Sequence, residues 1–205
     1  MIVNEFIPKP YTQLLDRGAV AYSAPSNIAL VKYWGKKAHQ IPANPSISFT
    51  LNNCKTATAL RFEKKTSKGF SFEVFLDGKL QDDFKPKIEQ FFSRIEVYVP
   101  FLSSYHFVIE TSNTFPHSSG IASSASGMSA LALCLMQIEQ QLDPAISKEF
   151  FNTKASFLAR LGSGSACRSI EGNLIVWGSH ANIEGSSDLV GIKYPYEVHH
   201  KFKNY

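Results

Sequence analysis

The stretch NTFPHSSGIASSASG, at residues 113–127, is the part of the chain that decides its fold. It follows a strand-like run at residues 106–111. It precedes a run in which Met128, Leu131, Leu135 and Ile138 recur at helical spacing. Small residues at a helix start expose unpaired N–H groups, and the helix dipole adds potential that favours phosphate. The stretch therefore predicts a phosphate-binding strand–loop–helix unit, with a turn made only for packing as the weaker alternative.

This phosphate loop is not of the Walker type, because no Gly-Lys-Ser/Thr follows its glycines. Ten of its fifteen residues are Ala, Gly, Ser or Thr, which favours the phosphate-binding interpretation over simple packing.

A second loop, GSGSACRS at residues 162–169, combines glycines with hydroxyls and one arginine. Glycine lets backbone N–H groups approach an oxyanion without a Cβ in the way. Ser163 and Ser165 add hydroxyl donors, and Arg168 offers a planar fork that suits a carboxylate or phosphate. We expect a ligand with negative oxygens here.

A third segment, SAPSNIALVKYWGK at residues 23–36, brings lysines, aromatics and a glycine to the end of a predicted strand. Ligand contacts often gather at such positions. Taken alone, the segment is ambiguous, because Tyr33 and Trp34 fit an ordinary core and Lys36 an ordinary solvated turn.

The remaining pattern predicts an α+β fold with a strand-rich first half. We expect the strands at residues 57–62 and 70–76 to pair, with Asp77-Gly78 forming a tight turn after the second strand. We expect one helix to begin at Pro86 and another to begin after Ser147, which would act as its N-cap. The predicted strands are residues 19–22, 28–34, 47–51, 57–62, 70–76, 106–111 and 173–177, with a break at residues 24–27.

The amino-acid composition limits the classes of protein to which the chain can belong. With 205 residues, 44% hydrophobic and 19% charged, the chain predicts one globular domain. The net charge of +4 is mild and scattered, so we expect no nucleic-acid partner. Three cysteines without a CxxC pair indicate free thiols in a reducing compartment. With no signal-peptide pattern and no long apolar run, we expect a cytoplasmic protein without a membrane partner.

Together, the three segments resemble the diphosphomevalonate decarboxylases of the GHMP kinase superfamily. Residues 24–36 match every fixed position of the pattern APxNIAxxKYWGK, and residues 162–169 match GSGSACRS. Residues 113–127 match NxFPxxxGLASSAxG with Ile121 in place of leucine. The resemblance implies a GHMP-kinase N-terminal domain over residues 1–205, with a mixed sheet covered by helices on one face and the C-terminal GHMP domain absent.

The resemblance also implies a reaction. The family uses ATP to phosphorylate the tertiary hydroxyl of mevalonate 5-diphosphate, after which phosphate and carbon dioxide leave to give isopentenyl diphosphate. By resemblance, Arg168 holds the carboxylate that is lost and Asn27 orients Arg168. The implied substrate-binding residues are Lys32, Tyr33, Trp34, Gly35, Lys36, Ser163, Gly164, Ser165, Ala166, Cys167 and Arg168.

A nucleotide site is implied in the same way. The resemblance assigns ATP and Mg²⁺ to the phosphate loop, with Ser123 and Ser124 near the metal and Ser123, Arg168 and Asn27 as catalytic residues. The implied nucleotide-binding residues are Pro116, Gly120, Ala122, Ser123, Ser124, Ala125 and Ser126.

The chain departs from the family pattern in two places that matter. Glu73 stands in the strand where the family often has an arginine, and no Asp-x-Gly-x-Asn segment supplies the family's catalytic aspartate. We therefore expect this chain to be inactive, or nearly so, on its own. Two alternatives stay open: a GHMP-type kinase that phosphorylates a mevalonate derivative without decarboxylation, and a non-catalytic binding fragment. A homodimer is also possible.

Overall fold

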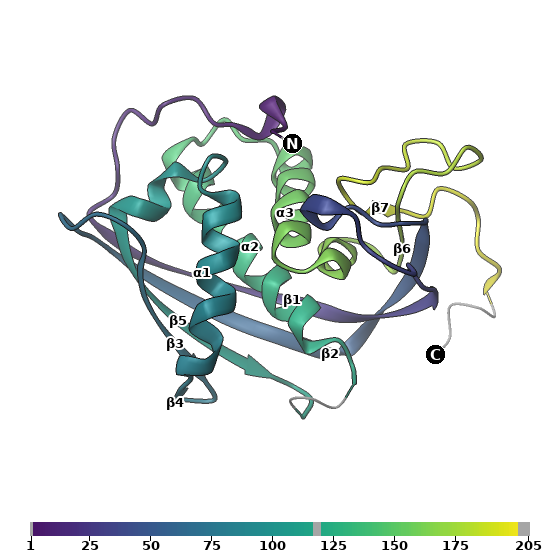
Figure 1. The fold of residues 1–205 in the computed structure, drawn as a ribbon, viewed down its shortest axis with the longest axis horizontal. Helices are drawn as coiled ribbons and strands as arrows, with labels where there is room; N and C mark the ends of the chain where they lie inside the picture. The colour runs from purple at the N-terminus through teal and green to yellow at the C-terminus, as the bar shows by residue number, and fades with distance from the viewer. Residues whose placement is uncertain (1, 117–119, 201–205) are drawn as a thin grey trace.

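Two long antiparallel strands form the centre of the sheet. The computed structural model describes residues 2–116 and 120–200. In it, β1 (Arg17–Val31) pairs with β2 (Ser46–Lys64) along almost their whole lengths. Figure 1 shows both strands crossing the molecule behind the helices.

The predicted breaks within these strands were wrong. The pairing register shifts between Pro25, opposite Lys55, and Ser26, opposite Leu51, so residues 52–54 bulge out of β2. Pro25 lies at the edge of this irregularity and is paired with Lys55, so β1 continues through the proline instead of ending at it.

The sheet is mixed and has the strand order β4-β3-β5-β2-β6-β7, with β1 on β2. Among the described strands, β3 and β5 pair in parallel and the other pairs are antiparallel. The further strands are β3 (Ser71–Leu76), β4 (Lys79–Leu80), β5 (Tyr105–Asn113), β6 (Leu174–Trp177) and β7 (Ile192–Lys193).

The predicted pairing of residues 57–62 with residues 70–76 was also wrong. Over residues 56–63 one edge of β2 is taken by β1 and the other by β5, so β3 lies one strand further out against β5. The hairpin that joins β3 to β4 is confirmed, with Asp77 at φ 50° and Gly78 at φ 75°.

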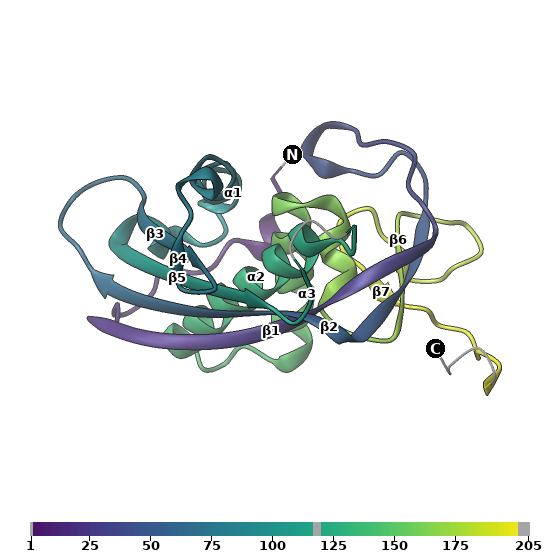
Figure 2. The same cartoon turned by 90° about the horizontal axis from the view of Figure 1, so that it is seen from below.

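Three helices cover one face of this sheet. They are α1 (Lys85–Ile95), α2 (Ser123–Leu142) and α3 (Lys148–Gly162). Figure 2 shows α1 end-on above the strands. Along β2, Leu60 and Phe62 are buried beneath the helices, while Arg61 and Glu63 on the other face are exposed. The mixed sheet and the one-sided helical layer confirm the predicted α+β fold.

Local signals placed the helices correctly. Ser147 caps α3 by accepting a hydrogen bond from the Phe150 N–H at 3.1 Å, as predicted. Pro86 lies in the first turn of α1, and α2 ends at Leu142 before Asp143-Pro144. The apolar face of α1, namely Ile88, Phe91, Phe92 and Ile95, is buried.

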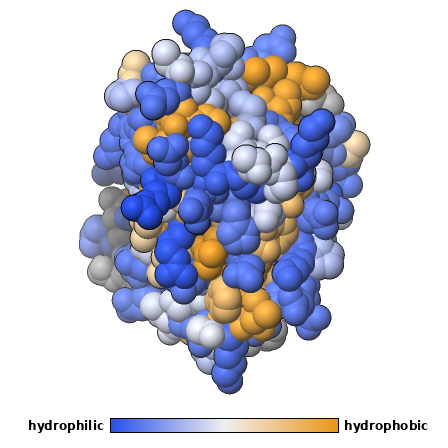
Figure 3. Space-filling view, turned by 90° about the vertical axis from the view of Figure 1, so that its left-hand side faces the viewer, coloured by the Kyte–Doolittle hydropathy of each residue, from blue (hydrophilic) through white to orange (hydrophobic). Residues whose placement is uncertain are grey.

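The surface in Figure 3 is mostly hydrophilic, with separate hydrophobic patches. Isolated apolar side chains of this kind are normal on soluble domains. Elsewhere, Leu30, Val31 and Trp34 are exposed close together in sequence, and Trp34 is 83% exposed. Among the described residues, no helix has both the length and the apolar character required to cross a membrane.

Candidate anion and nucleotide site

Arg168 is held by two segments far from it in sequence. It lies in the 3-10 turn Gly164–Ser169 that follows α3, and only 3% of it is exposed. One terminal nitrogen donates to Ser46 Oγ at 2.6 Å and the other to Asn27 Oδ1 at 3.3 Å. Asn27 Nδ2 in turn donates to Ser169 Oγ at 2.7 Å. We call Gly164–Ser169 the arginine turn; β1 and β2 fix its guanidinium.

The charge of this guanidinium is not neutralised within the part of the chain that the structure describes. None of the ion pairs there involves Arg168, and its buried Nε has no hydrogen-bond partner. Ser48, two residues from Ser46 on the same face of β2, also has a buried hydroxyl that has no partner among residues 2–116 and 120–200. Burial lowers the pKa of Arg168, although the nearby Cys167 and Tyr33 side chains oppose this. A buried, unpaired cation is costly, so the arrangement points to an anionic ligand.

Aromatic rings line this position. The guanidinium carbon lies 5.7 Å from the centre of the Tyr33 ring and 5.9 Å from that of Trp177. Tyr33 and Trp177 meet edge to face with centroids 5.0 Å apart. Contacts of this kind with aromatic rings partly stabilise a planar cation and leave its charge available to a ligand.

Residues 32–45, the lysine loop, join β1 to β2 beside this site. Asn44 closes the loop by accepting from the Trp34 N–H at 2.7 Å and donating to the Lys32 carbonyl at 2.9 Å. Lys32 and Lys36 are exposed. With Lys37, which is also exposed, the loop presents three ammonium groups on a backbone that its own hydrogen bonds hold in place.

Gly164 brings the lysine loop against the arginine turn. A Cβ at Gly164 would lie 2.7 Å from the Trp177 ring and 3.2 Å from Lys36 Cδ. Glycine is thus needed here for close packing of these two side chains, in addition to any contact its N–H makes with a ligand. Gly162 is similarly packed against Met128 and Phe91.

The other predicted residues of this turn point in two directions. Ser163 and Ser165 are half-buried, and their hydroxyls make no hydrogen bond to residues 2–116 or 120–200. Ala166 and Cys167 face the core, and burial raises the pKa of the Cys167 thiol to about 12. The serines can thus offer side chains to a ligand, whereas Ala166 and Cys167 can offer only backbone.

The phosphate loop reaches α2 through two left-handed residues. Gly120 has φ 80° and Ala122 φ 49°, and α2 begins at Ser123. Ser26 in β1 donates to the Ile121 carbonyl, which ties the first motif to this loop. Ser123 is half-buried and Ser124 exposed. Both hydroxyls stand at the positive end of a 20-residue helix.

The remaining loop residues are divided between core and surface. Ala125 is buried, and the buried Ser126 hydroxyl lies 2.6 Å from Thr56 Oγ1, so neither side chain is open to a ligand. Pro116 and Gly120 are exposed. His117 to Ser119 lie outside the described residues.

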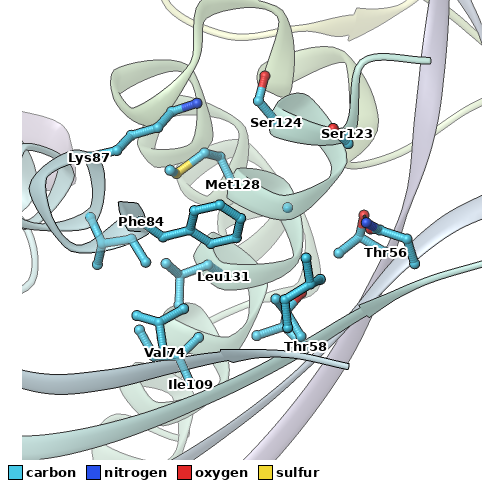
Figure 4. A pocket seen from close by; sticks show the side chains of 15 residues that line it. Thr56, Thr58, Val74, Phe84, Lys87, Ile109, Ser123, Ser124, Met128 and Leu131 are labelled. Atoms are coloured by element: carbon cyan, nitrogen blue, oxygen red, sulfur yellow. The ribbon is translucent and has the colours of Figure 1, made fainter. Parts of the chain in front are cut away.

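A cavity of about 300 Å³ opens beside the start of α2. Figure 4 shows its apolar floor, including Val74 and Ile109, and the Lys87 ammonium group extending from α1 toward the α2 side. Burial lowers the pKa of Lys87, and the charge of Lys36 lowers it further. The ammonium groups of Lys87 in α1 and Lys36 in the lysine loop are therefore near enough to repel each other.

Sequence patterns did not identify this cavity or Lys87. Its walls come from α1, α2, β2, β3 and β5, which only the folded topology brings together. The one local signal was the position of Lys87 in the first turn of a predicted helix, and this position does not distinguish a ligand contact from a solvated lysine.

The fold and its two candidate sites point to a class: an α+β domain suited to binding anions, with a buried arginine beside a lysine loop and a helix N-terminus beside an apolar cavity. Comparison with known sequences is more specific. The chain belongs to the family described as the diphosphomevalonate decarboxylase-like N-terminal domain, whose profile matches residues 24–188.

Relatives support this membership. The diphosphomevalonate decarboxylase of Aspergillus fumigatus is 32% identical over 180 residues, covering 82% of this chain and 43% of the relative. That of Candida albicans is 34% identical over 173 residues, covering 78% of this chain and 45% of the relative. The chain thus spans less than half the length of these relatives.

Similar solved structures support membership in the same family. The mevalonate diphosphate decarboxylase of Enterococcus faecalis has a TM-score of 0.69 at 33% identity, covering 87% of this chain and 52% of that chain. The Staphylococcus aureus enzyme has a TM-score of 0.67 at 34% identity, covering 85% and 49%. A further similar structure, with a TM-score of 0.67 at 33% identity and covering 86% and 50%, is described as MDDEF in complex with MVAPP, AMPPCP and magnesium.

Proposed function

We propose that this chain binds mevalonate 5-diphosphate and Mg-ATP as the N-terminal, substrate-holding part of a diphosphomevalonate decarboxylase. The reaction is mevalonate 5-diphosphate plus ATP giving isopentenyl diphosphate, ADP, phosphate and carbon dioxide. The observation that carries the proposal is the buried, unpaired Arg168 with Lys36 packed beside its turn.

On the substrate side, the two anionic ends of the ligand have separate partners. Arg168 receives the carboxylate, because its planar fork is fixed by Asn27 and Ser46 with Nε still unpaired. Lys32, Lys36 and the free hydroxyls of Ser163 and Ser165 receive the diphosphate. Tyr33 and Trp177 exclude water from the arginine, which strengthens its electrostatic interactions.

On the nucleotide side, the start of α2 and the adjacent cavity fit Mg-ATP. The apolar cavity suits a base, Lys87 suits a phosphate or ring acceptor, and the first N–H groups of α2 suit the phosphates. Magnesium is held in such sites largely by substrate phosphates, and the Ser123 and Ser124 hydroxyls are the proposed protein ligands. Bound magnesium would neutralise charge that develops on the transferred phosphoryl group.

The proposed role in substrate binding limits the catalytic activity that we expect of this chain alone. The Asp-x-Gly-x-Asn segment of the family does not occur within these 205 residues. Loss of a general base commonly costs about 10²–10⁴ in rate. We expect the chain to bind both ligands and to turn over slowly or not at all.

Parallel measurement of ADP and carbon dioxide tests this proposal. Wild-type chain with mevalonate 5-diphosphate, ATP and Mg²⁺ is expected to release the two products in equal, small amounts above a no-enzyme control. ADP without carbon dioxide would indicate the kinase alternative. Turnover at the rate of a full-length relative would contradict the assigned need for a further aspartate.

A further inference from the structure

Arg160 is a buried arginine outside the site described above. It lies near the end of α3, is 1% exposed, and its guanidinium carbon is 5.1 Å from the centre of the Phe157 ring. Nε donates to the Leu189 carbonyl at 2.7 Å, and one terminal nitrogen donates to the His39 carbonyl. One side chain thus joins α3 to two loops that are 150 residues apart in sequence.

The first of these loops is the lysine loop. His39 and Gln40 both have left-handed backbone, with φ of 58° and 59°, which is uncommon for residues other than glycine. Such strain persists when the surroundings hold the backbone in place. The hydrogen bond from Arg160 falls on this strained turn, three residues after Lys36.

The second contact supports the back of the arginine turn. Leu189 lies in a segment whose Gly191 N–H donates to Ser156 Oγ at 2.9 Å, and Ser156 Oγ donates to the Cys167 carbonyl at 3.0 Å. A Cβ at Gly191 would lie 2.5 Å from the Cys167 carbonyl oxygen. The segment therefore packs directly against the residue next to Arg168.

We propose that Arg160 is a positioning residue for the anion site, which fixes the lysine loop relative to the arginine turn and so sets where Lys36 meets a ligand held by Arg168. The inference rests on the proposed function, because it assumes that one ligand spans both groups. It predicts selectivity: weakening this link affects the ligand that spans the two loops and spares the nucleotide at α2.

The test compares Arg160→Gln with Arg94→Gln by calorimetric titration. Arg94 is a matched control, because it also donates to a carbonyl at the end of α3, Leu161 at 2.9 Å, with no hydrogen bond to the lysine loop. R160Q is expected to weaken binding of mevalonate 5-diphosphate by about tenfold and to leave Mg-AMPPCP affinity unchanged, while R94Q changes neither.

A double-mutant cycle separates positioning from general loss of stability. If Arg160 acts through Lys36, then Lys36→Met combined with R160Q loses no more affinity than Lys36→Met alone. Additive losses, or equal losses for both ligands, would overturn the inference. Where R160Q does not fold, Arg160→Lys takes its place in the cycle, because it keeps the charge but not the fork that reaches both carbonyls.

The two proposals fail differently. Wild-type chain that binds neither ligand would contradict the proposed function. Wild-type chain that binds mevalonate 5-diphosphate with the same affinity as its Arg160 variant would contradict only the positioning role.

Discussion

At the scale of single residues, the site depends on side chains that sequence patterns identify and on others that they do not. Arg168 and Asn27 were expected to meet, and they lie in hydrogen-bond contact. Ser46, which also fixes the guanidinium, carries no motif, and only the pairing of β2 with β1 and β6 brings it there. Local sequence reports residue chemistry, whereas such contacts depend on strand register.

Gly164 is a residue at which the addition of one methyl group should lower stability. Gly164→Ala places a methyl group 2.7 Å from the buried Trp177 ring, and overpacking of this kind costs about 1–3 kcal/mol. We expect a lower free energy of unfolding in urea. Gly127→Ala is the control, because no atom lies within 4 Å of the added group and alanine favours the α2 helix. Equal stability of G164A and wild type would contradict the packing role.

At the scale of secondary-structure elements, the helices were easier to predict than the strands. Caps and prolines are local signals, and they marked the starts of α1 and α3 to within one or two residues. Strand pairing is not local, so the continuity of β1 through Pro25 and the insertion of β5 between β2 and β3 escaped the sequence pattern. The predicted apolar stripe of α2 is buried, but so are Ser126, Ser129 and Glu139, because neighbours surround the helix.

The cap of α3 offers a quantitative test at this scale. Ser147→Ala removes the acceptor for the Phe150 N–H, and we expect the free energy of unfolding to fall by about 1 kcal/mol. Ser93→Ala in α1 is the matched control, because the Ser93 hydroxyl bonds only to the Glu89 carbonyl in its own helix. A loss that is as large in S93A as in S147A would argue against a capping effect.

At the scale of the whole molecule, a buried ion pair joins α2 to α3 and also contacts the N-terminal segment. Lys154 Nζ of α3 lies 2.6 Å from Glu139 Oε1 of α2, and both side chains are almost fully buried. Tyr11 donates to the same carboxylate oxygen at 3.3 Å, and Phe6 stacks on Phe157 with centroids 4.4 Å apart. Burial raises the pKa of Glu139 and lowers that of Lys154. The charge and hydrogen bond of each partner oppose the effect of burial on the pKa of the other.

Removal of one member of this ion pair should lower the free energy of unfolding more than replacement of both members. Lys154→Met leaves Glu139 buried and unpaired, and we expect a loss of about 3–5 kcal/mol in the free energy of unfolding. The double variant Lys154→Met/Glu139→Leu is expected to recover most of that loss. A double variant less stable than K154M would show that the pair is not the source of the effect.

The central claim is that Arg168 binds a carboxylate on a ligand whose diphosphate lies against the lysine loop. Calorimetric titration of mevalonate 5-diphosphate and of isopentenyl diphosphate, which lacks the carboxylate, tests it directly in wild type and Arg168→Gln. We predict that wild type prefers mevalonate 5-diphosphate by about tenfold to a hundredfold, as expected for a charge-assisted pair, and that R168Q loses this preference. Equal affinities in wild type, or an unchanged preference in R168Q, would contradict the account.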